Sequence, residues 1–403
     1  MLKSSSPLIW EMIKSFLQWA ESAKLRSYDW WDIWGTSFGS WAKTLYHKHR
    51  IAGTFVVTPI IFVDVLYPDF RKFFAEQRSF SICYAHIGMA YLTLFEITKQ
   101  QEYLHKAKAL VTPLINMASP HAHGLGWGIN LNWTTVQGLI PPGTPCNTQT
   151  AYAYEFFKQL HDITGHQEYI KYLSRIAKHV AYDFPERRIG DSLVCSYSTM
   201  DRAEVVNANS YRALMLIDAG MRFNDPEYLE KGIATLRYVL SMQGQDGSWP
   251  YSEDQPFIDN YHTCFIIKNL YKCKRVLGDT LGIENAIQRG LTYYFSYLFD
   301  KDGYPIPFAI KPRLTLYKYD SYDLAESIGL LAELDIEHER IIQLIHLAKT
   351  RFQTKGGWFI FRRYPFPHLK GIPYIRYANS AMFLALAKVL KLERYNPLDD
   401  SAN

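Results

Sequence analysis

The chain has 403 residues, of which 48% are hydrophobic and 21% charged, a composition that excludes an extensively disordered protein. Its 44 Lys and Arg residues exceed its 39 Asp and Glu residues by only five, and no run of like charges concentrates them. A nucleic-acid groove or a polybasic membrane anchor needs a denser basic footprint, so neither is expected. Aromatic residues make up 15% of the chain, which suits a large core and also a cleft whose rings stack on sugars.

Apolar residues recur at helical spacing from Leu8 to Ala20, after Ser6 and Pro7 in the positions of a cap and a first turn. This pattern predicts a helix of the mature fold rather than a signal peptide. The five cysteines are odd in number and include no CxxC pair, which favours a reducing compartment over a disulfide framework. We therefore expect a cytoplasmic protein, placed in the cytosol or at the inner face of the membrane.

Residues 27–78 follow this helix, and we expect them to form an irregular excursion before the first inner helix of the fold. They contain the segment IAGTFVVTPIIFVDVLY, Ile51 to Tyr67, which Gly53, Pro59 and Asp64 interrupt. It has no uninterrupted apolar stretch of about 18 residues, so it is not expected to cross a bilayer. A buried or partner-covered segment is the favoured interpretation, and shallow, peripheral membrane contact is the alternative.

Internal repeats organise the rest of the chain. Three similar segments read QEYLHKAKALV from Gln101, QEYIKYLSRIA from Gln167 and PEYLEKGIATL from Pro226. Each follows a turn-like stretch and carries an acidic residue in its first turn, as helix starts do. Weaker members are expected near 283–299 and 336–352. These amphipathic segments predict an outer set of helices, with the N-terminal helix as the sixth.

A second set of segments alternates with the first and is nearly apolar all round, as inner helices are. It begins with SFSICYAHIGMAYLTLFEIT from Ser79, and its later members start near Asn147, Asn207, Asn260, Asp320 and Asn379. Six inner and six outer helices predict one all-α domain over residues 1–403, built from six helical hairpins. Closed as a ring, the hairpins form an (α/α)6 toroid, and an open superhelical stack is the alternative.

The long connections precede the inner helices and are rich in Gly, Trp, Tyr and Pro, as in HGLGWGINLNW at 123–133 and KGGWFIFRRYPFP at 355–367. The connections after the inner helices are short. A closed ring therefore gathers the long loops on one face, and we expect the functional site there.

The segments HGLGWGINLNW, VVNANSYRALML, QDGSWPY and IDNYHT resemble the VpsJ-like proteins of bacterial surface-polysaccharide clusters, over roughly residues 80–390. Their larger superfamily is the six-hairpin, (α/α)6-toroid proteins, which includes glycoside hydrolases, polysaccharide lyases and sugar epimerases. The resemblance implies this fold and a role in surface-polysaccharide biosynthesis. Related proteins carry an early YDPYDGLNS motif; YDWWDIWG at 28–35 keeps both acids but lacks the Pro and the Asn-Ser end. The DGSW motif also occurs in terpene cyclases, but their DxDD motif is missing here, which leaves isoprenoid chemistry a minor alternative.

Acidic residues at the starts of inner helices are the candidate catalytic groups. Asp259 and His262 lie one helical turn apart, as an acid/base pair would, and a cap beside a buried His is the alternative. Asp320 and Asp323 form a carboxylate pair of the kind that cleaves glycosides, and a capping cluster explains them equally well. Asp201 with its neighbouring Arg suits a uronate carboxylate, and a loop ion pair is the alternative.

The site hypothesis places these side chains in one cavity with loop aromatics at its rim, against the alternative that the Trp side chains anchor the loops in the core. The candidate catalytic residues are Asp201, Asp259, His262, Asp320 and Asp323. The candidate substrate-binding residues are Trp127, Trp133, Arg202, Asn207, Trp249, Tyr251, Trp358, Arg376 and Asn379.

No cofactor is expected, because the sequence has no phosphate-binding glycine motif. No metal is expected either, since His121-x-His123 lacks further ligands at useful spacing. The sequence thus predicts a protein that acts by acid/base chemistry on an oligosaccharide or polysaccharide, anionic or lipid-linked forms included, as a hydrolase, lyase or epimerase. A non-catalytic glycan-binding or assembly scaffold is the alternative.

Overall fold

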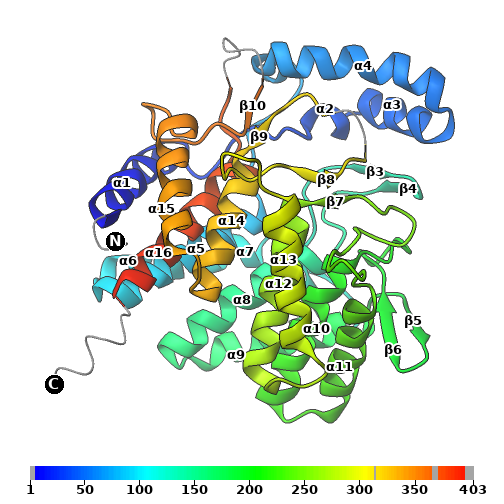
Figure 1. Ribbon diagram of the computed structural model, residues 1–403, viewed down its shortest axis with the longest axis vertical. Coiled ribbons are helices and arrows are strands. Elements are labelled where there is room, and N and C mark those ends of the chain that lie inside the picture. The colour runs from blue at the N-terminus through cyan, green and yellow to red at the C-terminus, as the bar shows by residue number, and fades with distance from the viewer. Residues whose placement is uncertain (1–4, 313–314, 365–370, 395–403) are drawn as a thin grey trace.

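Six helices form an inner ring in the computed structural model, which describes residues 5–312, 315–364 and 371–394. They are α5 (Ser81–Thr98), α8 (Asn147–Thr164), α10 (Val206–Phe223), α12 (Asn260–Leu277), α14 (Ser321–Leu334) and α16 (Ser380–Arg394). Each packs on the next, and α16 packs on α5, so the ring is closed (Figure 1). The predicted (α/α)6 toroid is confirmed, and the open superhelix is excluded.

The outer helices alternate with the inner ones along the chain, as predicted. They are α1 (Ser6–Ser22), α6 (Gln101–Ala109) with α7 (Val111–Ile115), α9 (Gln167–Tyr182), α11 (Pro226–Ser241), α13 (Ile283–Tyr297) and α15 (His338–Leu347), which continues into η3 (Ala348–Phe352). The repeated EYL and EYI segments begin α6, α9 and α11, and Tyr169 and Tyr228 are buried against the ring. The repeated tyrosine is therefore explained by the packing of each outer helix against the inner ring.

Contacts between α5 and α16 close the ring. Phe383 on α16 lies with its ring centroid 5.6 Å from that of Tyr91 on α5 and 5.1 Å from that of Phe16 on α1. The imidazole of His86 also hydrogen-bonds the Ser380 hydroxyl, 3.2 Å away. Because these side chains are buried, closure stabilises the ring through apolar packing.

Short antiparallel strand pairs occupy the long loops that precede the inner helices. The pairs are β1 (Ser119–Pro120) with β2 (Leu125–Gly126), β3 (Trp133–Thr135) with β4 (Gly138–Ile140), β5 (Glu186–Ile189) with β6 (Ser192–Cys195), β7 (Ile258–Asp259) with β8 (Phe308–Ile310), and β9 (Tyr319–Asp320) with β10 (Arg362–Arg363). The last two pairs join loops of neighbouring hairpins, so the loop face is cross-linked by backbone hydrogen bonds. Residues 365–367 of the predicted loop 355–367 lie outside the described residues.

Asparagine side chains at the starts of inner helices fasten these loops. The Asn379 amide, at the end of η4 (Ile375–Asn379), accepts from the Phe359 N–H at 2.7 Å and donates to the Phe359 carbonyl at 3.1 Å. Asn209 makes the same pair of bonds with Cys195. The sequence repeat aligned Asn207 with Asn379, but the residue that makes the equivalent bonds is Asn209, two positions later.

We expect Asn379→Ala to lower the free energy of unfolding by about 1–3 kcal/mol, because the buried Phe359 N–H would lose its partner. Urea denaturation followed by circular dichroism measures this loss. Asn285→Ala, at an exposed position of α13, is the control and should change the free energy by less than about 0.5 kcal/mol. Equal effects of the two substitutions would contradict a fastening role.

Residues 27–78 are not an irregular excursion, because most of them are helical. They contain α2 (Asp32–Gly35), α3 (Ser37–Lys48), α4 (Arg50–Leu66) and η2 (Pro68–Phe73). Helices α3 and α4 pack side by side at the edge of the molecule, next to the strands of the loop face (Figure 1). Among the described residues, no helix combines the length and apolar character needed to span a membrane.

Candidate functional site

Asp259 and His262 form a hydrogen-bonded pair at the start of α12. One Asp259 oxygen accepts the His262 backbone N–H at 2.9 Å, and the other lies 2.7 Å from the imidazole Nδ1. The Asp259 carboxylate therefore both caps α12 and binds the imidazole, so the two interpretations offered by the sequence hold together. The Asp259 side chain is 1% exposed and that of His262 is 18% exposed, so the imidazole is the member that solvent can reach.

Asp320 and Asp323 lie at the start of the neighbouring helix α14. Asp320 caps the helix by accepting the Tyr322 N–H at 2.8 Å, and its second oxygen accepts from Arg362 Nε at 2.9 Å. Burial raises the pKa of Asp320, and the Arg362 charge opposes that rise. Asp320 is therefore committed to two structural bonds.

Asp323 is the least satisfied carboxyl of this cluster. It is buried, and its Oδ1 has no hydrogen-bond partner among the described residues. Burial, followed by the charges of Asp320 and Asp259, raises its pKa well above the usual range. Because Asp320 and Asp323 interact, these two carboxyls titrate together, and Asp323 is the member that burial favours in the neutral, proton-carrying form.

Aromatic rings surround this acid cluster. The Tyr261 ring lies over the His262 imidazole with centroids 4.2 Å apart, and rings continue through Tyr322 and Tyr377 to Trp30. Tyr261, Tyr377 and Trp30 are half-buried. The indole N–H of Trp30 has no partner in the described part of the chain. Half-buried rings suit the apolar faces of a sugar.

Arg362 is held in place at the edge of the cluster. Its guanidinium lies 4.0 Å from the Tyr317 ring centroid and 4.7 Å from that of Trp30, while its Nε donates to Asp320. Rings on two sides and a carboxylate fix its orientation. Burial acts to lower the pKa of Arg362, but Tyr317 and Asp320 outweigh it and raise that pKa, so the group is a permanent cation.

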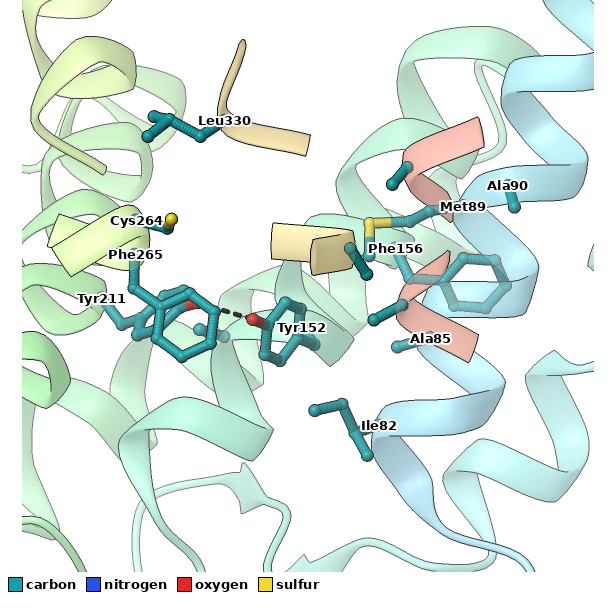
Figure 2. Packing of buried hydrophobic residues seen from close by; sticks show 14 of the residues in the cluster. Ile82, Ala85, Met89, Ala90, Tyr152, Phe156, Tyr211, Cys264, Phe265 and Leu330 are labelled. Carbon is teal, nitrogen blue, oxygen red and sulfur yellow. Dashed lines mark hydrogen bonds between the residues drawn. The ribbon is translucent and has the colours of Figure 1, made fainter. Parts of the chain in front are cut away.

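Further into the ring of inner helices, aromatic side chains pack against one another. Tyr152 and Tyr211 share a hydrogen bond between their hydroxyls at 2.6 Å, and Phe265 packs against both rings (Figure 2). Beyond them a cavity of about 1000 Å³ runs towards the C-terminal ends of the inner helices. None of the candidate site residues lines this cavity.

Ion pairs account for the charges of this axial cavity. Lys158 pairs with Asp218 at 2.5 Å, Lys272 with Glu155 at 2.6 Å, and Lys268 with Glu326. Burial acts to raise the pKa of Asp218, but Lys158, the Tyr154 hydroxyl and Arg222 lower it below its usual value. These groups neutralise one another across the helices, and the cavity holds no acid/base pair comparable to Asp259 and His262.

Two loop tryptophans anchor the loops in the core, as the alternative interpretation held. The Trp127 indole N–H donates to the Leu114 carbonyl at 2.8 Å, and that of Trp249 donates to the Val239 carbonyl at 3.0 Å. Both side chains are buried, so neither can lie at a cavity rim. Each instead bonds a carbonyl near the end of the preceding outer helix.

The glycine of the DGSW motif serves the same packing. Gly247 has φ +93°, and a Cβ there would lie 2.3 Å from the Arg289 carbonyl oxygen of α13. Gly357, in the loop before α16, has φ +89° and a Cβ would lie 2.0 Å from the Ser15 carbonyl oxygen of α1. Only glycine allows these turns to approach the next outer helix so closely.

Arg376, Asn379 and Asn207 are also buried rather than presented to a ligand. Arg376 binds both oxygens of Asp29, with Nε and an Nη donating at 2.8 and 2.6 Å. Asn379 uses its amide on the loop backbone, and the Asn207 Oδ1 is buried without a partner among the described residues. The site prediction for Arg376 and Asn379 is corrected, because their polar groups are already occupied.

The remaining candidates divide between loop structure and the site. Asp201 accepts from Ser198 and from two backbone N–H groups of its own loop, while Arg202 is exposed, so the two do not form a recognition pair. Tyr251 is half-buried with its ring centroid 4.9 Å from the His262 imidazole, which places it at the cluster. Trp133 and Trp358 are half-buried on the loop face.

Folding brings His121 near His179 and Asp183, two side chains that could bind a metal ion and that sequence spacing did not reveal. Hydrogen bonds account for only part of this group, because the buried Nε2 of His179 has no partner among the described residues. Asp183 binds the Nδ1 atoms of His179 at 2.7 Å and of His123 at 2.6 Å. Burial lowers the pKa of His179 to about 4, and its Nε2 faces the backbone of Gly126.

Sequence reasoning missed Trp30, Tyr261, Tyr322, Tyr377 and Arg362. A usable signal existed, since a tyrosine lies within two positions of the polar residue that starts α12, α14 and α16. Arg362 belongs to the quoted loop FIFRR, but no local pattern shows that β10 pairs with β9 and so carries Arg362 to Asp320. Contacts between separate hairpins are invisible in a repeat pattern.

No protein-family model matches the sequence, and no curated protein matches it. Solved structures do share its fold. A cellobiose 2-epimerase from Bacillus thermoamylovorans superposes with a TM-score of 0.58 at 11% identity, over 77% of this chain and 87% of that one. A family 88 glycosyl hydrolase from Bacteroides vulgatus gives 0.55 at 12%, over 84% and 98%, and a polysaccharide lyase gives 0.54 at 12%, over 83% and 97%. These neighbours are carbohydrate-active enzymes of three reaction types, and at such identities the likeness shows the fold alone.

Proposed function

We propose that this protein is a carbohydrate-active enzyme that works by proton transfer at the starts of α12 and α14. The observation that carries the proposal is the Asp259–His262 pair beside Asp323, a buried carboxyl whose Oδ1 has no partner among the described residues. An oriented imidazole and a neutral carboxyl provide a base and an acid in one place. The fold neighbours, which act on saccharides by their printed names, support the substrate class.

The hydrogen bonds support the following roles for these residues. With its Nδ1–H donating to Asp259, the His262 imidazole presents Nε2 with a free lone pair, and Nε2 can accept a proton from a substrate or a water molecule. Asp259 is the residue that orients it. Asp323, kept neutral by its surroundings, supplies a proton to a leaving or rearranging oxygen. Glycosidic cleavage, elimination and epimerisation all fit this pair.

The charge of the site favours a neutral saccharide over an anionic one. Two carboxylates, Asp259 and Asp320, lie beside one fixed cation, Arg362, which already donates to Asp320. The half-buried rings of Tyr261, Tyr377 and Trp30 offer apolar surface for the faces of a sugar. An added substrate carboxylate would be repelled by the acid cluster.

The biological setting follows from the resemblance of the sequence motifs to VpsJ-like proteins. On that basis we place the protein in the assembly of a bacterial surface polysaccharide, in the cytoplasm or at the inner face of the membrane, with a free or lipid-linked oligosaccharide as substrate. The competing role is a scaffold that binds glycan without turning it over.

A panel of neutral and uronate-containing oligosaccharides tests the function. Three readouts separate the reactions: new reducing ends report hydrolysis, ultraviolet absorbance of an unsaturated uronate reports elimination, and deuterium uptake from heavy water into recovered sugar reports epimerisation. We expect His262→Gln to bind the glycan but to turn it over about 10²–10⁴-fold more slowly.

The exposed His338→Gln on α15 is the matched control and should retain the wild-type rate. A wild-type protein that binds a glycan without any of the three products would support the scaffold. Equal turnover by wild type and His262→Gln would remove His262 from the chemistry.

A further inference from the structure

Exposed apolar side chains are concentrated on α3, α4 and η2. Of the nineteen large hydrophobic side chains exposed among the described residues, eleven lie between residues 38 and 74. We call these eleven the apolar patch. Its members are Phe38, Trp41, Ile51, Phe55, Phe62, Val63, Leu66, Tyr67, Phe70, Phe73 and Phe74.

The outward face of α4 is mainly apolar and carries no charged side chain between Arg50 and Asp64. Ile51, Phe55, Phe62 and Leu66 follow one another at intervals of four, seven and four residues, which places them on one side of the helix. Phe55 is 77% exposed.

The opposite face of α4 is packed on the protein. Ile60 forms a small buried cluster with Trp34 and Ala42. A Cβ on Gly53 would lie 2.1 Å from the Tyr46 Cα, so α3 and α4 are in close backbone contact. The helix is therefore held flat against the body of the molecule, and its outward face is available for a partner.

The segment that carries the apolar patch has an excess of positive charge. Residues 38–74 contain five Lys or Arg and two Asp, which is three of the five net positive charges of the chain. Both acids are paired, Asp64 with Arg71 and Asp69 with Lys72. The other cations, Lys43, Lys48 and Arg50, lie on α3 and at the start of α4.

We propose that the apolar patch binds the surface of a membrane that contains anionic lipids. Eight of its eleven side chains are aromatic, and Trp, Phe and Leu are typical of the apolar face of helices that lie in the membrane interface. The basic residues complement anionic headgroups. A second copy of the chain fits less well, because two facing patches would bring their positive charges together.

The patch is tied to the candidate site by Arg71. This buried guanidinium donates to the Asp29 carbonyl at 3.0 Å and to the Trp30 carbonyl at 3.3 Å, and it pairs with Asp64 of α4. A membrane bound by α4 would therefore lie at a fixed orientation to Trp30 and the acid cluster. Binding itself needs no substrate, so the inference stands independently of the proposed reaction.

Co-sedimentation with lipid vesicles tests the proposal on the full chain. We expect the protein to bind vesicles of mixed phosphatidylcholine and phosphatidylglycerol, and to bind them more weakly at high salt or when phosphatidylcholine is used alone. The double variant Phe55→Glu/Phe62→Glu should lose at least about tenfold in vesicle partitioning. The double variant Ile189→Glu/Met221→Glu, at exposed apolar positions elsewhere, should bind as the wild type does.

Circular dichroism checks that both variants fold, and turnover of a soluble glycan checks that the site is intact. Failure of the wild type to sediment with either vesicle would overturn the proposal. So would equal losses in the two double variants, or binding that is the same with and without phosphatidylglycerol. A concentration-dependent dimer that Phe55→Glu/Phe62→Glu abolishes, without vesicle binding, would assign the patch to a second copy instead.

Discussion

Replacing Asp323 by Asn is expected to lower turnover by about 10²–10⁴-fold while leaving the protein folded. The amide matches the carboxyl in size, and the site favours a neutral group at this position, so the substitution removes the acidic proton and little else. Steady-state kinetics on the saccharide identified by the panel, with circular dichroism of both proteins, measures the effect.

The pH profile gives a second readout of the same group. An acid whose pKa is raised stays protonated into a higher pH range, and it loses its proton as the pH passes that raised value. The rate of the wild type should therefore fall on the alkaline side, and the residual rate of Asp323→Asn should lack that fall.

Glu326→Gln is the matched control, because Glu326 is buried one turn further along α14 but pairs with Lys268 in the axial cavity. We expect the folded Glu326→Gln protein to keep its turnover within a few-fold. If Glu326→Gln abolished turnover and Asp323→Asn did not, the site would lie in the axial cavity and our assignment would be wrong.

Replacing Arg376 by Met is expected to lower the free energy of unfolding by about 3–5 kcal/mol. The Arg376 guanidinium holds both oxygens of Asp29, which is fully buried, and the pair joins two segments 347 residues apart in sequence. Its removal would leave a buried carboxylate without its cation, with only the Trp31 N–H among the described residues donating to it at 2.9 Å. Urea denaturation measures the loss.

Two further variants test the cause of this loss. Combining Arg376→Met with Asp29→Asn should cost less than the sum of the single substitutions, because the second change removes the stranded charge. Arg188→Met, which breaks an exposed pair with Glu230, should cost no more than about 1 kcal/mol. If the Arg376→Met protein were as stable as the wild type but had a raised KM, Arg376 would bind substrate, as the sequence predicted.

The architecture could be predicted from the sequence because each hairpin repeats the same pattern of one apolar inner helix and one amphipathic outer helix. The EYL and EYI segments identified three outer helices, and apolar runs identified the inner ones. Register was less certain, since Asn207 and Asn209 lie two positions apart and only the contact with Cys195 distinguishes them. The excursion at 27–78 lacks the repeat, and its helices were missed for that reason.

The site was harder to predict because composition does not show which way a side chain faces. Trp127 and Trp249 follow glycine-rich turns, as sugar-stacking residues often do, yet their indole N–H groups reach backwards to helix carbonyls. The Asp259–His262 pair was local and could be predicted from spacing. The environment of Asp323 depends on Asp259 of another hairpin, and sequence spacing carries no such information.

Ring closure has a consequence for how the protein is made. Ser81 of α5 leaves the ribosome 299 residues before Ser380 of α16, the helix that covers it. At ordinary translation rates that interval is about 15–60 s, during which an almost wholly apolar helix has no partner on one side. We expect nascent chains to depend on chaperones over this interval, and synonymous changes that slow translation between the two helices to lower the soluble yield.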